Sequence, residues 1–524
     1  MKYDPPQHLT QNWHLTKPSA TGKLGIVVSQ ARGAAQAGVA VLEAGGNAID
    51  AAVATALALT TLEPWNSGIG GIGFAVVHRA GQANADVVDF GPVAPRKLSP
   101  SNFKLTGRMT EDMFAWSEVE GDANMHGPLS FCVPSSVAGY DKLHATWGKL
   151  PIAEVMAPAV AIAKRGLPQD FYTTLKIAGC ASLLRLYPES ARIYLRDGLP
   201  PVPVTSGRTG FFRLGNLPDT LETLSRDGLR AYYNGDIAQS IAADTAAMGG
   251  VLDREDLRAC QARIVPATEV AWRNGRVAQL ATGLTAGPTL AQVLHDMRDV
   301  PVGPEPDAHW YVTLARSLKA AYADRLAGMG EAEPQAAETC TTHLTVCDAE
   351  GTMVSMTTTL LSTMGSSVVL PGTGVLVNNG VMWFDPRPGQ ANSIAPGKRP
   401  LTNMCPIILK QDGKPILAAG ASGGRKIMAA VFELMSFVAD FDMDLETAAS
   451  YPRIDVSNAV DVTADQRLSP EIVAALAADG PTMLVEHCFN PGNFANPNVI
   501  VQRSDGSREG ISDAQSPWAG AVAQ

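Results

Sequence analysis

The chain has 524 residues, of which 46% are hydrophobic and 18% are charged, and its formal net charge is −10. This length allows about two to four average domains, or one large α/β unit with a substantial core. The acidic balance, without any basic run or aromatic–basic stripe, argues against a nucleic-acid partner. The net negative charge does not exclude a small anionic substrate, because such a substrate interacts mainly with the charges of its own pocket.

The cysteines and the N-terminal segment bear on the compartment. The seven cysteines are odd in number and none has Cys-x-x-Cys spacing, which favours reduced thiols over a disulfide framework or a zinc site. Residues 1–20 are polar and lack the apolar stretch of a signal peptide. The longest apolar run, 51–62, is dotted with threonine and too short to span a bilayer. We therefore expect a cytoplasmic protein without a membrane partner.

The first predicted elements are two apolar helices. Residues 31–44 are rich in alanine, and Gly45 and Gly46 end this helix. Asn47 is a good N-cap for a second helix that extends to about residue 59. Both helices are apolar enough to be buried, as expected of helices that cover a sheet.

A glycine-rich loop, 68–73, follows the second helix. Its Gly-x-Gly-x-x-Gly spacing matches the dinucleotide fingerprint. However, a helix precedes it and a strand, 74–78, follows it, which reverses the strand–turn–helix order of a nucleotide site. Close backbone packing beside a buried strand is the better explanation of the glycines. We therefore predict no nucleotide cofactor.

The middle of the chain has the pattern of a scaffold. Residues 87–90 predict a strand, and the pattern from 134 to about 257 is helical. Residues 263–282 alternate as strands do, and 307–326 predict a long helix.

The segment 330–340 is polar and acidic, so it has little apolar surface to bury and we expect it to be exposed and mobile. The apolar residues around the turn 348–351 then predict a β-hairpin. A mobile linker leads directly into a buried strand that begins Thr341-Thr342-His343. This arrangement is expected if the chain is cleaved at the Cys340–Thr341 bond. The freed Thr341 would carry a hydroxyl nucleophile and an α-amine base in one residue. Alone, these residues also fit a plain strand start, and Cys340 also fits a small residue at a flexible bond.

Further motifs strengthen the cleavage hypothesis. They are 45–52, Thr357-Thr358-Thr359, 374–379, Lys398-Arg399-Pro400-Leu401 and Gly420-Ala421-Ser422-Gly423-Gly424. Together with Thr341-Thr342-His343, and in this order, they resemble the γ-glutamyltranspeptidase family of self-cleaving N-terminal-nucleophile hydrolases. The resemblance implies an α+β fold, a four-layer αββα sandwich. In it, 1–340 would form the large subunit and 341–524 the small subunit of one domain, from a single precursor. It implies no metal and no organic cofactor, and leaves open whether such heterodimers pair further.

The resemblance also assigns catalytic roles. Thr341 would be the nucleophile, Thr359 would orient its hydroxyl, and Gly423 and Gly424 would offer backbone N–H groups to the oxyanion. Without the family, the threonine run around Thr359 could reflect β-propensity alone. We interpret His343 as structural, not as a base.

The contacts that the family makes with a glutamyl substrate are altered here. Gly91 stands where the family has an arginine that binds the α-carboxylate. Leu361, Gly380 and Trp383 stand where the family has polar groups, some of which hold the α-amine. A pocket without these acceptors should reject an α-amino acid, because an unpaired buried ammonium is costly.

Other polar groups remain. Thr402 and Asn403 replace paired serines of the family, Arg425 follows the oxyanion glycines and suits bidentate binding of a carboxylate, and Asn66 is a further pocket candidate. These residues favour a small amide with a carboxylate near its carbonyl. Among relatives, oxamate amidohydrolase fits best: Thr341 attacks, ammonia leaves and water releases oxalate. The alternatives are a γ-glutamyltransferase or glutathione hydrolase with a rebuilt pocket, a cephalosporin-type acylase, and an uncleaved, non-catalytic scaffold.

Overall fold

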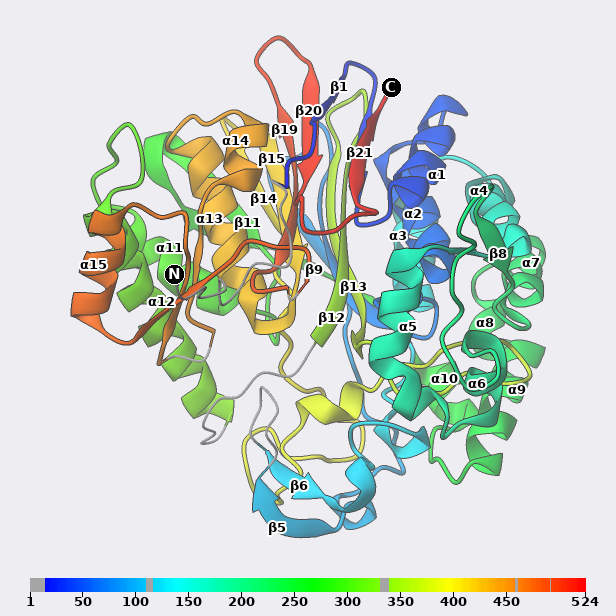
Figure 1. The fold of residues 1–524 in the computed structure, drawn as a ribbon. Helices are drawn as coiled ribbons and strands as arrows, with labels where there is room; N and C mark the ends of the chain where they lie inside the picture. The colour runs from blue at the N-terminus through cyan, green and yellow to red at the C-terminus, as the bar shows by residue number, and fades with distance from the viewer. Residues whose placement is uncertain (1–14, 110–115, 330–338, 458–459, 491) are drawn as a thin grey trace.

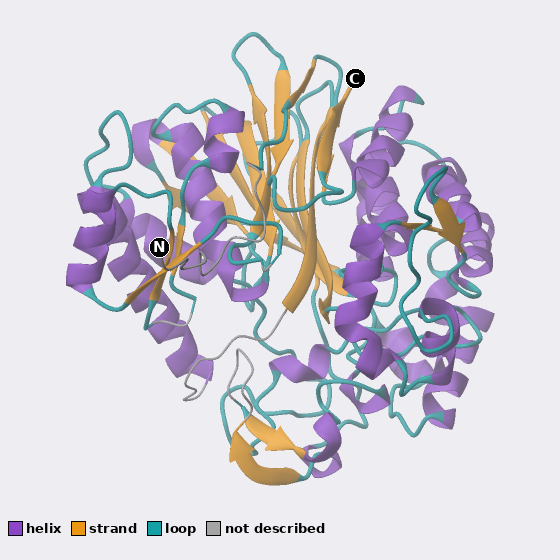
Figure 2. Cartoon of the chain, in the orientation of Figure 1, coloured by secondary structure: helices purple, strands orange, loops and turns teal. Residues whose placement is uncertain are grey.

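Two seven-stranded β-sheets stacked face to face form the centre of the molecule, and helices cover the outer face of each sheet (Figures 1 and 2). The computed structural model describes residues 15–109, 116–329, 339–457, 460–490 and 492–524. The arrangement is the predicted four-layer αββα sandwich of the α+β class.

The first sheet holds the Thr-Thr-His segment in its third strand, and all of its neighbouring strands are antiparallel. From edge to edge its strands are β21 (Gly520–Ala523), β2 (Ile26–Ser29), β12 (Thr339–Cys347), β13 (Met353–Ser362), β3 (Ile72–His78), β4 (Asp86–Phe90) and β9 (Arg263–Pro266). The predicted hairpin is confirmed as β12 and β13.

The second sheet carries the Gly-Ala-Ser-Gly-Gly motif at the end of its fourth strand. From edge to edge its strands are β1 (Ala20–Gly22), β20 (Arg508–Ser512), β19 (Asn496–Gln502), β15 (Lys414–Ser422), β14 (Ile407–Gln411), β11 (Arg276–Leu280) and β10 (Thr268–Ala271). Smaller sheets are formed by β16 (Ile454–Asp455), β17 (Val462–Asp465) and β18 (Thr482–Val485), by β5 (Leu105–Met109) and β6 (Ser117–Val119), and by β7 (Leu167–Gln169) and β8 (Gly210–Phe212).

The helices divide between the two outer layers (Figure 1). On the side of the first sheet lie α1 (Arg32–Glu43), α2 (Ala48–Leu62), α3 (Ser136–Trp147), α4 (Ile152–Arg165), α5 (Phe171–Leu184), α6 (Pro188–Tyr194), α7 (Leu217–Asp227), α8 (Ala231–Asn234), α9 (Asp236–Ala247) and α10 (Arg254–Ala259). On the side of the second sheet lie α11 (Gly287–Met297), α12 (Ala308–Met329), α13 (Ile427–Ala439), α14 (Leu445–Ser450) and α15 (Pro470–Asp479). None of the described helices is long and apolar enough to cross a membrane.

Strand alternation explains why the two sheets stack. In β2, Ile26 and Val28 belong to the apolar core between the sheets, whereas Val27 belongs to the core under α1 and α2. Because successive side chains of a strand point to opposite faces, an apolar strand buried on both sides fits a middle layer.

The local predictions near the N-terminus are confirmed. The side chain of Asn47 accepts hydrogen bonds from the N–H groups of Ile49 and Asp50 and caps α2. The glycine-rich loop connects α2 to β3, and a Cβ at Gly70 would lie 2.1 Å from the carbonyl oxygen of Leu376. The glycines therefore serve close packing. Residues 330–338, most of the predicted mobile linker, lie outside the described residues.

Candidate active site

Thr341 lies in a β-bulge at the start of β12. In this bulge the single residue Thr341 faces two residues of β13, Thr359 and Leu360. The extra residue belongs to β13, and a bulge redirects the side chains of the strand that carries it, here Thr359 and Leu360. Thr341 is only 3% exposed, and its Oγ lies 3.4 Å from the Oγ of Thr359. The predicted nucleophile and the predicted orienting hydroxyl are thus neighbours.

The backbone after Thr359 fixes the position of its hydroxyl. The N–H of Leu361 donates to the Oγ of Thr359 at 2.8 Å. Leu361 adopts a φ of 86°, which is rare for a bulky residue. Backbone strain of this kind persists where the surrounding structure enforces it and is common at active sites.

The glycine pair lies where β15 leaves the second sheet. Gly423 has a φ of 133°, and a Cβ there would meet the Cα of Ala495 at 2.8 Å, so only glycine fits. Gly424 begins a short 3₁₀ helix, η6 (Gly424–Lys426), that leads into α13 and neighbours β12. Backbone N–H groups at the start of a helix are suited to stabilise negative charge.

His343 is built into the contact between the sheets. Its Nδ1 lies 2.9 Å from the Oγ of Thr357, and its Nε2 lies 3.4 Å from the Oγ of Ser355. Its ring fills the space where a Cβ of Gly420 would stand. Burial lowers the pKa of His343 to about 3, so the ring is neutral near pH 7 and a poor base. This geometry supports the structural interpretation.

A buried carboxyl that the sequence analysis missed supports the residue after the nucleophile. The Oε2 of Glu63, at the end of α2, lies 2.5 Å from the Oγ of Thr342. Asn66, predicted for the substrate pocket, donates to the other oxygen of Glu63 at 2.7 Å. An acidic residue directly after a fifteen-residue helix whose only other charged residue is Asp50, in the first turn, was the available signal. A contact between Asn66 and substrate stays a prediction.

The three positions predicted to lack the family's polar groups are apolar or closed in the structure. Leu361 and Trp383 are buried in one apolar cluster with Met404 between the sheets. Gly380 begins the short helix η5 (Gly380–Trp383), and a Cβ there would lie 2.5 Å from the Sγ of Cys132. The side chains of Leu361 and Trp383 offer no hydrogen-bond acceptor to an ammonium group.

A guanidinium group lies beside Gly91, although Gly91 itself has no side chain. A Cβ at this position would lie 2.7 Å from the Nη2 of Arg399. Arg399 donates from both terminal nitrogens to the carboxylate of Asp89, and Arg263 donates to the same carboxylate at 2.7 Å. Two cations on one carboxylate leave a net positive charge. Arg399 belongs to the motif Lys398-Arg399-Pro400-Leu401, but the motif did not predict that this side chain lies beside Gly91.

Two side chains of α12 hold the other predicted substrate-binding residues. Arg325 donates to the carbonyl oxygen of Thr402, and its Nη2 lies 3.4 Å from the Oδ1 of Asn403. The hydroxyl of Tyr322 donates to the carbonyl oxygen of Arg425. Thr402, Asn403 and Arg425 are all buried. The structure places them, and their contacts with substrate stay predictions.

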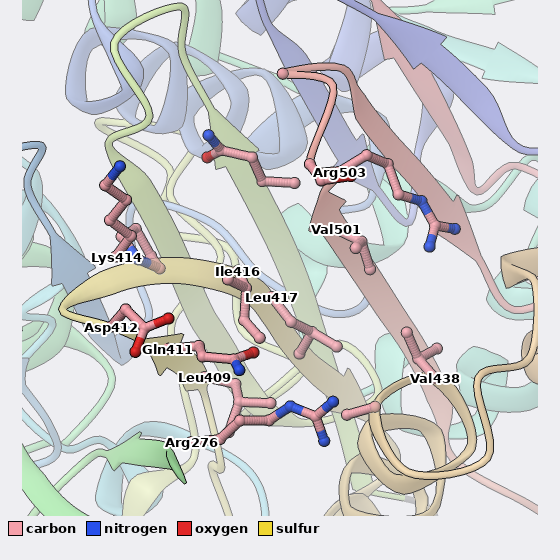
Figure 3. Close-up of a pocket in the computed structure, with 15 residues that line it drawn as sticks. Arg276, Leu409, Gln411, Asp412, Lys414, Ile416, Leu417, Val438, Val501 and Arg503 are labelled. Carbon is pink, nitrogen blue, oxygen red and sulfur yellow. The ribbon is translucent and has the colours of Figure 1, made fainter. Parts of the chain in front are cut away.

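A separate cavity of about 650 Å³ lies at the other end of β15 (Figure 3). It is lined by Arg276, Leu409, Gln411, Asp412, Lys414, Pro415, Ile416, Leu417, Val438, Ala439, Val501, Gln502, Arg503, Ser504 and Gly506. The strand from Lys414 to Ser422 spans about 26 Å. Arg276 and Arg503 of this cavity pair with Asp440 and Glu509. It is therefore distinct from the candidate active site.

A hydroxyl in a bulge, a second hydroxyl beside it and a glycine loop at a helix start form a geometry for acyl transfer by an N-terminal nucleophile. Among the described residues, no group of three or more His, Cys, Asp or Glu side chains is placed to hold a metal ion.

Comparison with known proteins agrees with this class. The sequence profile of the gamma-glutamyltranspeptidase family matches residues 34–340 and 329–523. The chain is 29% identical to the acylase ACY 1 proenzyme of Pseudomonas sp. (strain V22), covering 95% of this chain and 93% of that protein. It is 28% identical to the glutathione hydrolase proenzyme of Escherichia coli (strain K12), covering 94% and 91%. The fold is similar to that of cephalosporin acylase from Bacillus halodurans, with a TM-score of 0.84, 24% identity and 99% of both chains covered.

The chain belongs to the gamma-glutamyltranspeptidase family. It is an N-terminal-nucleophile amidohydrolase, an enzyme that acts on amide bonds.

Proposed function

We propose that the chain cleaves itself between Cys340 and Thr341. The Oγ of Thr341 attacks the carbonyl carbon of Cys340, the peptide nitrogen becomes the α-amine, and water hydrolyses the resulting ester. The observation that carries this proposal is the position of Thr341, buried in a bulge with its Oγ 3.4 Å from that of Thr359. The two relatives named as proenzymes support it.

Cleavage there would give a large subunit, 1–340, and a small subunit, 341–524. Each sheet takes strands from both sides of the bond; in the first sheet, for example, β2 precedes it and β13 follows it. The subunits would therefore stay together as one domain, held by the strand hydrogen bonds and by the core between the sheets.

In turnover, the α-amine of Thr341 takes the hydroxyl proton and the Oγ attacks the amide carbon of the substrate. The N–H groups of Gly423 and Gly424 stabilise the oxyanion. The amine of the substrate leaves with a proton, an ester on Thr341 remains, and water releases the acid.

For the substrate we propose a small amide with a carboxylate next to its carbonyl, and oxamate as the best example. Its products would be oxalate and ammonia. The buried apolar side chains of Leu361 and Trp383 disfavour an α-ammonium group. Arg425, directly after the glycine pair, and the cationic cluster of Arg399 and Arg263 favour a carboxylate.

The purified protein, incubated separately with oxamate, glutathione and a cephalosporin carrying an acidic side chain, tests this substrate class. We expect ammonia from oxamate and little or no glutamate from glutathione. Faster turnover of glutathione would favour a glutathione hydrolase, and faster turnover of the cephalosporin would favour an acylase. The two relatives named above are the reason to include both alternatives.

Replacing Arg425 with leucine should lower kcat/KM for oxamate by roughly 10- to 100-fold, because a charge-assisted hydrogen bond contributes about 1.5–3 kcal/mol. Arg425→Lys keeps the charge but loses the bidentate geometry, so its kcat/KM should lie between those of the wild type and Arg425→Leu. Cleavage at Thr341 should proceed in both variants. Steady-state kinetics measure the effect, and an unchanged kcat/KM in the leucine variant would remove Arg425 from the substrate site.

A further inference from the structure

A continuous chain of buried hydrogen bonds connects the nucleophile strand with the glycine loop. Glu63 contacts Thr342, the residue after Thr341, at 2.5 Å. The Oγ of Thr342 also lies 3.4 Å from the Oε1 of Gln30. The Nε2 of Gln30 donates to the Oγ of Ser422, the residue before Gly423. Glu63, Gln30 and Thr342 are at most 2% exposed.

The orientation of the Gln30 amide is fixed by a group that only accepts hydrogen bonds. The Nε2 of Gln30 lies 3.0 Å from the carbonyl oxygen of Asn496, which only accepts hydrogen bonds. The amide nitrogen of Gln30 therefore faces Asn496, and its oxygen faces Thr342. At the other end, the Oε1 of Glu63 accepts from Asn66, so the Oε2 of Glu63 is the oxygen that faces Thr342.

The hydroxyl of Thr342 has one hydrogen, and it lies between two oxygens. If Glu63 is ionised, both the Oε2 of Glu63 and the Oε1 of Gln30 are acceptors, and Thr342 can donate to only one of them. If Glu63 carries a proton on Oε2, it donates to Thr342, and Thr342 donates to Gln30. Only the neutral acid makes every bond in the chain.

We propose that Glu63 is a positioning residue for the nucleophile, and that it acts as a neutral acid whose proton joins Thr342 to Gln30 and thereby to the glycine loop. The inference rests on the proposed function, because it takes Thr341 as the nucleophile and Gly423 and Gly424 as the oxyanion donors. Glu63 itself is assigned no contact with substrate.

The surroundings of Glu63 favour the neutral form. Burial raises the pKa of Glu63 to about 7, against smaller opposing contributions from Thr342, Lys176 and Asn66. Lys176 of α5 is the charged group that faces Glu63 in the described residues, and its amine lies 5.3 Å from the ring centre of Tyr172. Thr342 on β12 and Asn66 in the loop are neutral. After cleavage, the α-amine of Thr341 is a further titrating group near Glu63.

The sign of the pH effect follows from this. As pH rises through about 7, Glu63 loses its proton, the link from Thr342 to Gln30 is broken, and the rate falls. The α-amine of Thr341, with an ordinary pKa of about 7.7–8.0, acts in the opposite direction, because it must lose its proton to serve as a base. Before cleavage this amine does not exist, so cleavage of the precursor reports on Glu63 without it.

Glu63→Gln is the decisive variant, because a glutamine amide donates to Thr342 and accepts from Asn66 just as the neutral acid does. Wild-type precursor, made by cell-free synthesis and moved into buffers between about pH 5.5 and pH 9, should cleave roughly tenfold more slowly for each pH unit above the pKa of Glu63. Glu63→Gln should cleave at the wild-type rate at low pH and show no alkaline fall. Gels that separate precursor from subunits give both rates.

Two further variants serve as a control and as an independent test. Glu433→Gln alters another fully buried glutamate, in α13, whose pKa burial also raises, and it should keep the wild-type alkaline fall. Thr342→Val removes the central hydroxyl at nearly constant volume and should slow cleavage below the pKa of Glu63, where the wild-type link is intact. If Glu63→Gln does not fold, Thr342→Val still tests the proposal, because cleavage of this variant at the wild-type rate would overturn it.

The outcomes separate this inference from the proposed function. The role of the neutral acid would be overturned if the cleavage rate of Glu63→Gln fell over the same pH range as that of the wild type. It would also be overturned if this variant failed to cleave at any pH while its melting temperature was unchanged. A wild-type chain that never cleaves at Cys340–Thr341 would instead overturn the proposed function, and with it the premise of this inference. Because the assay needs no substrate, an error about oxamate does not affect it.

Discussion

Thr341→Ala is expected to remain one uncut chain of 55.1 kDa that hydrolyses no amide. The variant lacks the hydroxyl that would attack the carbonyl of Cys340, so neither cleavage nor the acyl intermediate can form. Loss of a nucleophile costs on the order of 10⁶-fold in kcat in a well-measured protease, and the uncut variant also lacks the α-amine base. Intact-mass spectrometry and an ammonia assay measure the two effects.

Thr341→Ser is the matched control, because it keeps the hydroxyl and removes only a methyl group. We expect it to be cleaved and to retain activity. Cleavage of Thr341→Ala at the same bond would show that another group attacks Cys340, and an uncut, inert wild type would favour the non-catalytic scaffold.

Gly423→Ala should lower kcat by about 10²–10³-fold, which is the effect of removing one oxyanion donor. At a φ of 133°, with the Cα of Ala495 only 2.8 Å from the added Cβ, the loop must shift and move its N–H groups away from the oxyanion. The measurement is kcat on protein that has already been cleaved, since the shift should also slow cleavage itself.

Gly413→Ala provides the control for backbone strain. Gly413 lies in the turn at the other end of β15, with a φ of 75° and no atom within 4 Å of an added Cβ. It should lose stability, by about 1 kcal/mol, because alanine disfavours this backbone conformation. Its kcat should stay at the wild-type value. Equal losses of kcat in both variants would assign the effect at Gly423 to general instability.

Much of the candidate site could be predicted from local sequence. Helix starts and ends, the hairpin of β12 and β13 and the packing role of the glycine-rich loop follow from short-range rules of capping, alternation and turn formation. The order of the motifs indicated the family and the αββα fold. The choice of Thr341 as nucleophile also came from sequence, because the linker and the strand adjoin it directly.

Other parts of the site depend on residues far apart in the chain. Glu63 meets Thr342 across 279 positions, and Arg399 meets Asp89 across 310. No periodicity connects such pairs. They come together because two sheets stack and carry the ends of several strands to one place.

The sequence by itself therefore determined many of the elements, indicated the family and pointed to Thr341 as the proposed nucleophile, because each depends on neighbours along the chain. Only the tertiary structure showed the bulge of β13 opposite Thr341, the guanidinium of Arg399 beside Gly91, and the buried Glu63. These features depend on burial and on contacts between strands and helices, which exist only once the layers have packed.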